Sequence, residues 1–181
     1  DDNTGVHPVM EGVQQMFQEG QLSVLHSAGY PNQNRSHFRS MDIWKSGSPA
    51  GEVWNDGWLG RYLDTLHPAF PEDYPNSQHP DPFAITMGNV VSETCQGKSA
   101  NFSLTLTDPF SLTPLTEGAP GDVPETPYGD ELTFLRTTIK QANKYGERIT
   151  AVAEVGNNIM EYPDGNRLAE QLKNVALLIS G

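Results

Sequence analysis

The stretch GYPNQNRSHFRSMDIW, residues 29–44, decides how the chain is expected to fold. It follows a short apolar run, Leu22 to Ala28, which has the length and the turn-bounded composition of a buried strand. Its glycine and proline predict a turn, and the apolar spacing of residues 36–45 predicts a helix. We therefore expect a strand over residues 21–28, then a polar loop, then a helix.

The rest of the chain alternates strand-like runs with amphipathic helical patterns. Gly20 is expected to close the first helix, and Gly146 is expected to interrupt the longest one. Helices are expected over residues 7–17, 57–66, 132–159 and 165–179. Strands are expected over residues 83–87 and 102–107, and proline-rich loops over 67–82 and 108–126.

Five helices and three short strands favour an α/β fold with a doubly wound, mostly parallel sheet and flanking helices. Three strands make a small sheet for that arrangement, and the last helix ends where such a fold would normally begin its next strand. The hydrophobic fraction of 36% is also low for a globular domain. Residues 1–181 are therefore expected to form a single α/β domain that is a fragment of a larger one.

Composition excludes several classes of partner. The formal net charge is -12, and the 11 Lys and Arg residues are mostly scattered. Nucleic-acid binding requires a basic patch, so we expect no nucleic-acid partner. No run approaches the length of a membrane-spanning helix, so we expect no membrane insertion. The one cysteine, Cys95, cannot form an internal disulfide.

Against this acidic background, Arg35, Ser36, His37 and Arg39 form a compact polar cluster. A loop at the carboxyl end of a strand is where open α/β sheets place ligands. The arginines suit charge-assisted hydrogen bonds to an anionic oxygen, and His37 suits substrate contact or general-acid chemistry. The alternative is that Ser36 caps the helix, with the arginines solvated. Ser36 is disfavoured as a nucleophile because no base partner can be assigned.

The other histidines share no metal-ligand spacing, so we expect no metal site and no cofactor site within this chain. His26 is expected in the core, and His67 and His79 are expected in solvated loop. Among the tryptophans, Trp44 and Trp58 fall on apolar helix faces and are expected in the core. Trp54 is the one expected to line a cleft.

Two segments carry a resemblance to a known family. VHPVMEGVQQMFQEGQLSVLHSAGYPNQNRSHFRSMDIWKSG, residues 6–47, followed by GWLGRYLD, residues 57–64, resembles the bacterial domain of unknown function family 1501. The resemblance is close from His7 to Asp64 and looser in the later helices. It implies an alkaline-phosphatase-like and sulfatase-like fold. It also implies twin-arginine export, hence a periplasmic or secreted protein.

The resemblance covers only the middle section of the family. Its Gly-Gly-Asn-Asp-Gly-like, Gly-Phe-Asp-Thr-His-like and Asp-His-Gly-like motifs, the implied carriers of the metal ligands and the nucleophile, have no counterpart here. The resemblance therefore implies a parent hydrolase of phosphate or sulfate esters that uses zinc, manganese or calcium. This chain alone would be inactive and would contact a small anionic ester through Arg35, Ser36, His37 and Arg39. The alternative is a non-enzymatic exported binding or surface protein that reuses the fold.

Overall fold

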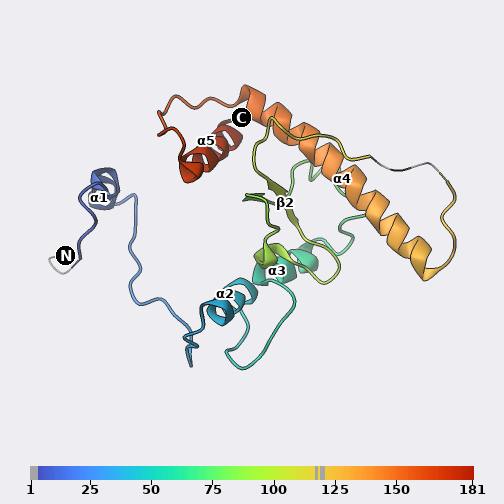
Figure 1. The fold of residues 1–181 in the computed structure, drawn as a ribbon, viewed down its shortest axis with the longest axis horizontal. Coiled ribbons are helices and arrows are strands. Elements are labelled where there is room, and N and C mark those ends of the chain that lie inside the picture. Colours follow the sequence, from blue (N-terminus) through green and yellow to red (C-terminus); the bar gives the residue numbers. More distant parts are fainter. Residues whose placement is uncertain (1–3, 117, 119–120) are drawn as a thin grey trace.

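The computed structural model describes residues 4–116, 118 and 121–181 of a mixed α/β chain (Figure 1). The described part contains five α-helices, one 3-10 helix and two strands. In chain order these are α1 Glu11–Gln18, α2 His37–Ser46, α3 Trp58–Leu66, β1 Ala84–Met87, η1 Glu93–Cys95, β2 Ser103–Leu106, α4 Pro127–Val155 and α5 Arg167–Ser180.

The two strands form a small parallel sheet. Ala84 lies opposite Ser103 at one end, and Met87 lies opposite Leu106 at the other. Parallel neighbours need a long crossover, and residues 88–102, which include η1, supply it. The strands predicted over 83–87 and 102–107 and their parallel pairing are confirmed. Helix α4 runs along one side of this sheet, and α2 and α3 lie at its lower end beside η1 (Figure 1).

A compact aromatic cluster forms the core beside the sheet. Leu63 of α3 packs against Phe70 and Phe102, and the rings of the two phenylalanines stack with their centroids 4.3 Å apart. Pro71 is fully buried next to them. The prediction that residues 67–82 are surface loop is therefore wrong for Phe70 and Pro71. These two apolar residues are buried because the loop folds back over the end of the sheet.

The strand predicted over residues 21–28 is absent, and this is the main error of the sequence prediction. The segment is an exposed connection between α1 and α2, and Leu25 is 88% exposed. A strand needs a neighbour to take up its backbone hydrogen bonds, and the two-stranded sheet lies elsewhere in the described structure. His26, which was expected in the core, is exposed and lies 3.4 Å from the hydroxyl of Thr4.

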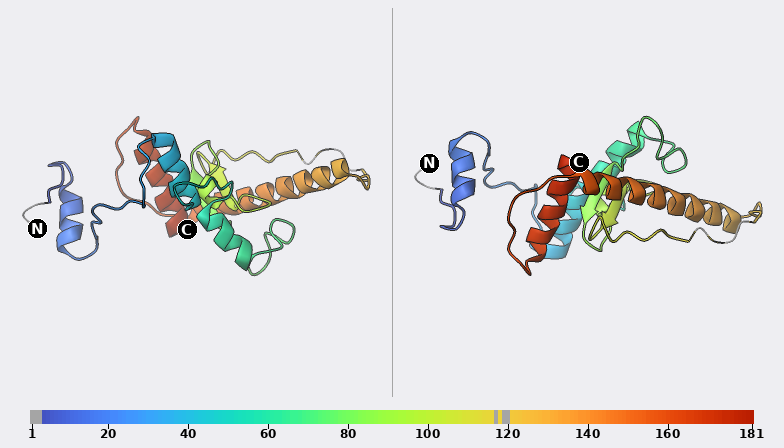
Figure 2. Two further views of the ribbon diagram at one scale, coloured as in Figure 1. Left: turned by 90° about the horizontal axis from the view of Figure 1, so that it is seen from below. Right: turned by 90° about the horizontal axis from the view of Figure 1, so that it is seen from above.

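Helix α1 forms as predicted but stands apart from the other elements (Figure 2). Gly20 follows it with a φ of 74°. The N–H groups of Gly20 and Gln21 donate to the carbonyls of Phe17 and Met16, which is the Schellman pattern of a helix end. The prediction for Gly20 is thus confirmed. Within the described structure, none of the eight residues of α1 is buried.

Helix α4 is continuous, and it begins five residues before and ends four residues before the predicted bounds of 132–159. It spans 29 residues, starts at Pro127 with the side chain of Thr126 as its N-cap, and continues through Gly146. The predicted interruption at Gly146 is wrong, because one glycine costs a helix only about 1 kcal/mol and packing outweighs it. A stripe at four-residue spacing faces the rest of the chain: Gln141, Tyr145, Ile149 and Ala153. The described helices, α4 included, lack the combination of length and apolarity that a membrane crossing requires.

The structure is open and exposes much apolar surface. Its accessible surface is 13087 Å², whereas a compact monomer of 19.9 kDa would expose about 8,700 Å². Trp44 and Trp58, which were expected in the core, are 67% and 51% exposed. Their helix faces are apolar, as predicted, but no other described element covers them.

Candidate functional site

A hydrogen-bonded loop leads into α2 and fixes the position of Arg35. The hydroxyl of Tyr30 lies 2.9 Å from that of Ser40 and accepts a 3.0 Å hydrogen bond from the backbone N–H of Asn34. Ser40 in turn donates to the carbonyl of Asn34 at 2.7 Å. The side chain of Asn34 accepts a 2.8 Å hydrogen bond from the backbone N–H of Ser36. The loop is therefore tied to the first turn of the helix that follows it.

Ser36 serves as the N-cap of α2. Its backbone is extended, with φ of -68° and ψ of 121°, and its hydroxyl accepts a 3.4 Å hydrogen bond from the N–H of Arg39. This satisfies one of the amides that the first turn of a helix leaves without a partner. The capping alternative for Ser36 is thus confirmed, and the hydroxyl has a structural task.

Arg39 is turned away from the loop and toward residues 48–52. Its guanidinium donates to the carbonyls of Pro49 and Ala50, each at 3.3 Å, and to the carbonyl of Glu52. One nitrogen of the group also lies 3.5 Å from the hydroxyl of Ser48. All of these contacts are made by one nitrogen, Nη2, whereas Nη1 is buried and has no hydrogen-bond partner among the described residues. The guanidinium thus holds the segment after α2 in place and does not line the same hollow as Arg35. The structure therefore separates Arg39 from Arg35.

Arg35 and His37 lie together at a shallow hollow of about 380 Å³. Both side chains are exposed, and that of Arg35 makes no ion pair with any described residue. No described Asp or Glu lines the hollow. The amides of the first turn of α2 also begin here, and the positive end of the helix dipole favours an anion. The arrangement provides one free guanidinium, one imidazole and a helix N-terminus without a competing carboxylate.

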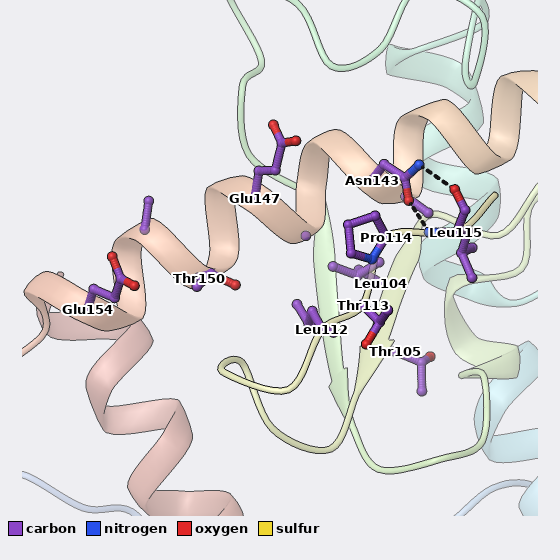
Figure 3. Close-up of a pocket in the computed structure, with 13 residues that line it drawn as sticks. Leu104, Thr105, Leu112, Thr113, Pro114, Leu115, Asn143, Glu147, Thr150 and Glu154 are labelled. Atoms are coloured by element: carbon purple, nitrogen blue, oxygen red, sulfur yellow. Dashed lines mark hydrogen bonds between the residues drawn. The ribbon is translucent and has the colours of Figure 1, made fainter. Parts of the chain in front are cut away.

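A groove between α4 and residues 112–115 has the opposite electrostatic character (Figure 3). Its volume is about 510 Å³, and Glu147 and Glu154 are its charged lining residues. Asn143 pairs with the backbone of Leu115 through two hydrogen bonds of 2.7 and 2.9 Å. The two carboxylates make this groove unsuitable for an anionic ligand.

Trp54 lines a third hollow, of about 280 Å³, as predicted for a cleft residue. Its indole N–H donates to Glu52 at 2.9 Å, and the guanidinium of Arg61 lies 4.6 Å from its ring centre. Arg61 is paired with Asp56 at 2.7 Å, and Lys45 is paired with Glu93 at 3.1 Å. The two cations around this hollow are therefore neutralised by neighbouring acids.

His67 and His79 are partly buried, so the prediction that they are solvated is wrong. The ring of His67 lies 4.0 Å from that of Phe83 and 4.9 Å from that of His79, and its Nδ1 lies 3.0 Å from the hydroxyl of Tyr74. Burial, and then the charge of His79, lower the pKa of His67 below its ordinary value. This pair is held by the aromatic core, which the loop sequence did not reveal.

Metal binding does not fit the residues present. In the described ranges, no three His, Cys, Asp or Glu side chains are grouped so that they could hold a metal ion. The divalent metal that the family resemblance implies therefore has no ligand set in the part of the chain that the structure describes. No chemical step is assigned to such a metal here.

Sequence reasoning missed the residues that shape the loop. Tyr30, Asn34 and Ser40 position Arg35 without belonging to the predicted cluster. One local signal was available, because Asn two residues before Ser is typical of a turn in which the Asn side chain accepts a backbone N–H. The tie between Tyr30 and Ser40 spans ten residues and carries no such signal.

Fold and site together define a mixed α/β protein with a small parallel sheet and an exposed cationic loop before α2. Comparison with known proteins gave no match, since no family model fits the chain and no curated protein or solved structure is significantly similar to it. The resemblance to the domain of unknown function family 1501 therefore stays a prediction.

Proposed function

We propose that the loop before α2 binds the anionic group of a small-molecule phosphate or sulfate ester. The observation that supports this best is the free guanidinium of Arg35, in a chain of net charge -12, at a hollow that no described carboxylate lines. Arg39 and Ser36 hold the surrounding backbone, so they support the site without contacting the ester. The resemblance supplies the ester class, because members of the implied superfamily hydrolyse such groups.

In this proposal each group has a separate task. The guanidinium of Arg35 holds two oxygens of the ester by charge-assisted hydrogen bonds. The free amides at the start of α2 add a weaker attraction for the same negative charge. His37, in the first turn, contacts the bridging oxygen of the ester and is suited to protonate a leaving group.

The proposal for the whole protein rests on the resemblance to the domain of unknown function family 1501. We propose that these residues belong to an exported, periplasmic or secreted hydrolase with an alkaline-phosphatase-like fold, of which residues 1–181 form a section. The two-stranded parallel sheet with flanking helices is compatible with such a section. The contribution of this chain is to hold the ester, since its described residues provide no metal ligand set.

Calorimetric titration of the whole chain with phenyl phosphate and phenyl sulfate tests the binding step. Arg35→Ala should weaken binding about tenfold, the amount expected for one lost charge-assisted contact. Arg167→Ala is the matched control, because Arg167 is also exposed at the start of a helix, α5. Equal affinity in the two variants would show that Arg35 does not hold the ester.

A second candidate is a non-enzymatic binding protein, and the role of Ser36 favours it. The hydroxyl of Ser36 is engaged as a helix cap, and no described side chain that could act as a base is hydrogen-bonded to it. In this case the chain would bind the ester without turning it over. Assays of aryl phosphate and aryl sulfate hydrolysis by the full-length parent protein, with zinc, manganese or calcium added, separate the two. Turnover that His37→Ala reduces supports the hydrolase, whereas binding without turnover supports the second candidate.

A further inference from the structure

The hollow that Arg35 and His37 share continues along α2 to an apolar wall. Met41 and Trp44 line the same hollow of about 380 Å³, and both belong to α2. They are 40% and 67% exposed, so a ligand can reach both. His37, Met41 and Trp44 follow one another at spacings of four and three residues, which places them on one face of the helix. One surface therefore carries a guanidinium at one end and an indole at the other.

The spacing along α2 determines where the organic part of an ester would lie. A helix rises about 1.5 Å per residue, so Met41 lies about 6 Å and Trp44 about 10 Å beyond His37 along the helix axis. Helical side chains generally lean toward the N-terminus of their helix, which brings the indole of Trp44 back toward Met41. A methyl group on an anion held by Arg35 would stop short of the indole. Two fused aromatic rings would run past Met41 toward it.

The polar groups beside this wall are engaged within the protein. The hydroxyls of Tyr30 and Ser40 lie 2.9 Å apart, and that of Ser40 also donates to the carbonyl of Asn34. The side-chain oxygen of Asn34 accepts a hydrogen bond from the N–H of Ser36. A sugar would bring several hydroxyls, each of which costs free energy when it leaves water without gaining a partner. These contacts therefore favour an apolar organic part over a sugar.

The next step rests on the proposed function and names the class of ester. We propose that the hollow selects esters whose organic part is a flat, apolar group of two fused aromatic rings. The rings would pack against Met41 and Trp44 while Arg35 holds the anion. Aromatic rings stack favourably on an indole, and a thioether makes favourable contacts with ring edges. The volume of the hollow lies within the range of clefts that bind small molecules.

The competing explanation is that another protein surface covers Trp44. In that case the wall would not discriminate between esters that carry the same anion. Selection among matched esters is therefore the property that distinguishes a ligand-binding wall from a protein-binding one.

Calorimetric titration of the whole 181-residue chain with three phosphate esters tests the selection. Methyl phosphate, phenyl phosphate and 2-naphthyl phosphate share the anion and differ in the organic part, and 2-naphthol carries the two rings without the anion. Affinity should rise from the methyl to the phenyl to the naphthyl ester. The naphthyl ester should bind about tenfold more tightly than the methyl ester, because it adds apolar burial and stacking. It should also bind more tightly than 2-naphthol.

Two tryptophan variants assign the preference to a residue. Trp44→Ala should remove most of the tenfold preference and leave the affinity for methyl phosphate unchanged, because the indole would contact only the organic part. Trp58→Ala is the matched control, since Trp58 is 51% exposed and does not line the hollow. In the unmodified protein, the indole N–H signal of Trp44 should shift with 2-naphthyl phosphate and stay in place with methyl phosphate.

The outcomes separate this inference from the proposed function. Equal affinity for the three esters, weakened in Arg35→Ala, would overturn the aromatic selection and leave anion binding in place. A naphthyl preference that persists in Trp44→Ala would put the rings on another surface and overturn the selection as well. Equal affinity for 2-naphthol and 2-naphthyl phosphate, or failure of all three esters to bind, would overturn the anion site and the selection together.

Discussion

Four residues within five sequence positions have different tasks in the structure. Ser36 caps α2, Arg39 holds the carbonyls of residues 49–52, and only Arg35 and His37 remain exposed at the hollow. A cluster of polar residues in a sequence is therefore not a site by itself. The residues whose side chains hold backbone groups of the protein define the frame, and the residues exposed at the hollow define the chemistry.

Capping by Ser36 predicts a specific pattern of stability. Ser36→Ala should lower the free energy of unfolding by about 1 kcal/mol, because the N–H of Arg39 loses its acceptor. Ser36→Asp should leave stability nearly unchanged, because a carboxylate also caps a helix and favours its positive end. Urea unfolding followed by circular dichroism measures both. Equal losses in the two variants would contradict the capping role.

The lowered pKa of His67 predicts that the folded chain loses stability in mild acid. Its pKa is lowered in the folded chain from an ordinary value of 6.5, by burial and by His79. The unfolded chain therefore binds a proton more readily, and stability falls as the pH drops below this value and is fully present above it. Urea unfolding between about pH 7.5 and about pH 5.5 should show this fall.

Two variants test whether His67 causes the pH dependence of the unfolding free energy. His67→Gln should flatten the fall in unfolding free energy, because the titrating group is removed. His26→Gln, at an exposed histidine, should keep the same pH dependence as the unmodified chain. A fall of equal size in both variants would place the acid sensitivity at another group.

At the scale of elements, close backbone approaches decide how the helices pack. A Cβ added at Gly60 of α3 would lie 2.1 Å from the carbonyl oxygen of Gln96, whereas one added at Gly146 of α4 would meet only Leu112 at 3.8 Å. Helix α3 thus needs a glycine to reach the segment after η1. Gly146 of α4 makes no such close approach.

These two glycines predict effects of opposite sign for the same substitution. Gly60→Ala should destabilise the chain by about 1–3 kcal/mol, because the backbone of residues 96–97 must move away. Gly146→Ala should stabilise it by about 0.5–1 kcal/mol, because alanine is the better helix former. Thermal or urea unfolding of both variants checks the pair. Destabilisation by Gly146→Ala would contradict the continuous packing of α4.

Sequence periodicity predicted elements whose signals are local and missed those that depend on distant partners. All five helices were predicted, because apolar spacing and end residues such as Gly20 are local features of the sequence. Residues 21–28 have a strand-like composition, but a strand also requires a neighbour that local sequence does not specify. The interruption at Gly146 was predicted wrongly for a related reason, since burial of Tyr145 and Ile149 outweighs the glycine between them.

Likewise, only part of the candidate site could be predicted from the sequence. The position of the cluster before a helix, and the capping by Ser36, follow from local rules. The engagement of Arg39 by the carbonyls of residues 49–52, and the burial of His67 by Phe83, depend on how the chain turns back on itself. Arg35 and Arg39 were therefore predicted as alternative partners of the anion, and the structure separates them.

At the scale of the whole molecule, we expect local stability to differ between parts of the chain. The aromatic core, the sheet and α4 bury residues, whereas α1 stands apart with none buried (Figure 2). An isolated helix of this length is marginal in water. We expect amide hydrogens of α1 to exchange almost as fast as in an unfolded chain, while those of residues 141–153 are protected.

Hydrogen exchange measured by mass spectrometry tests this distribution peptide by peptide. Peptides from the sheet provide an internal reference for protection. Strong protection of residues 11–18 would show that α1 is packed against another surface in solution, contrary to the structure.

The central claim is that the loop before α2 holds an anionic ester through Arg35. Titration of the 15N-labelled chain with phenyl phosphate, followed by the backbone amide signals, tests it most directly. The amides of His37 and Phe38 and the guanidinium of Arg35 should shift together and saturate, and phenol should leave them in place. Shifts confined to other residues, or the same shifts in Arg35→Ala, would contradict the claim.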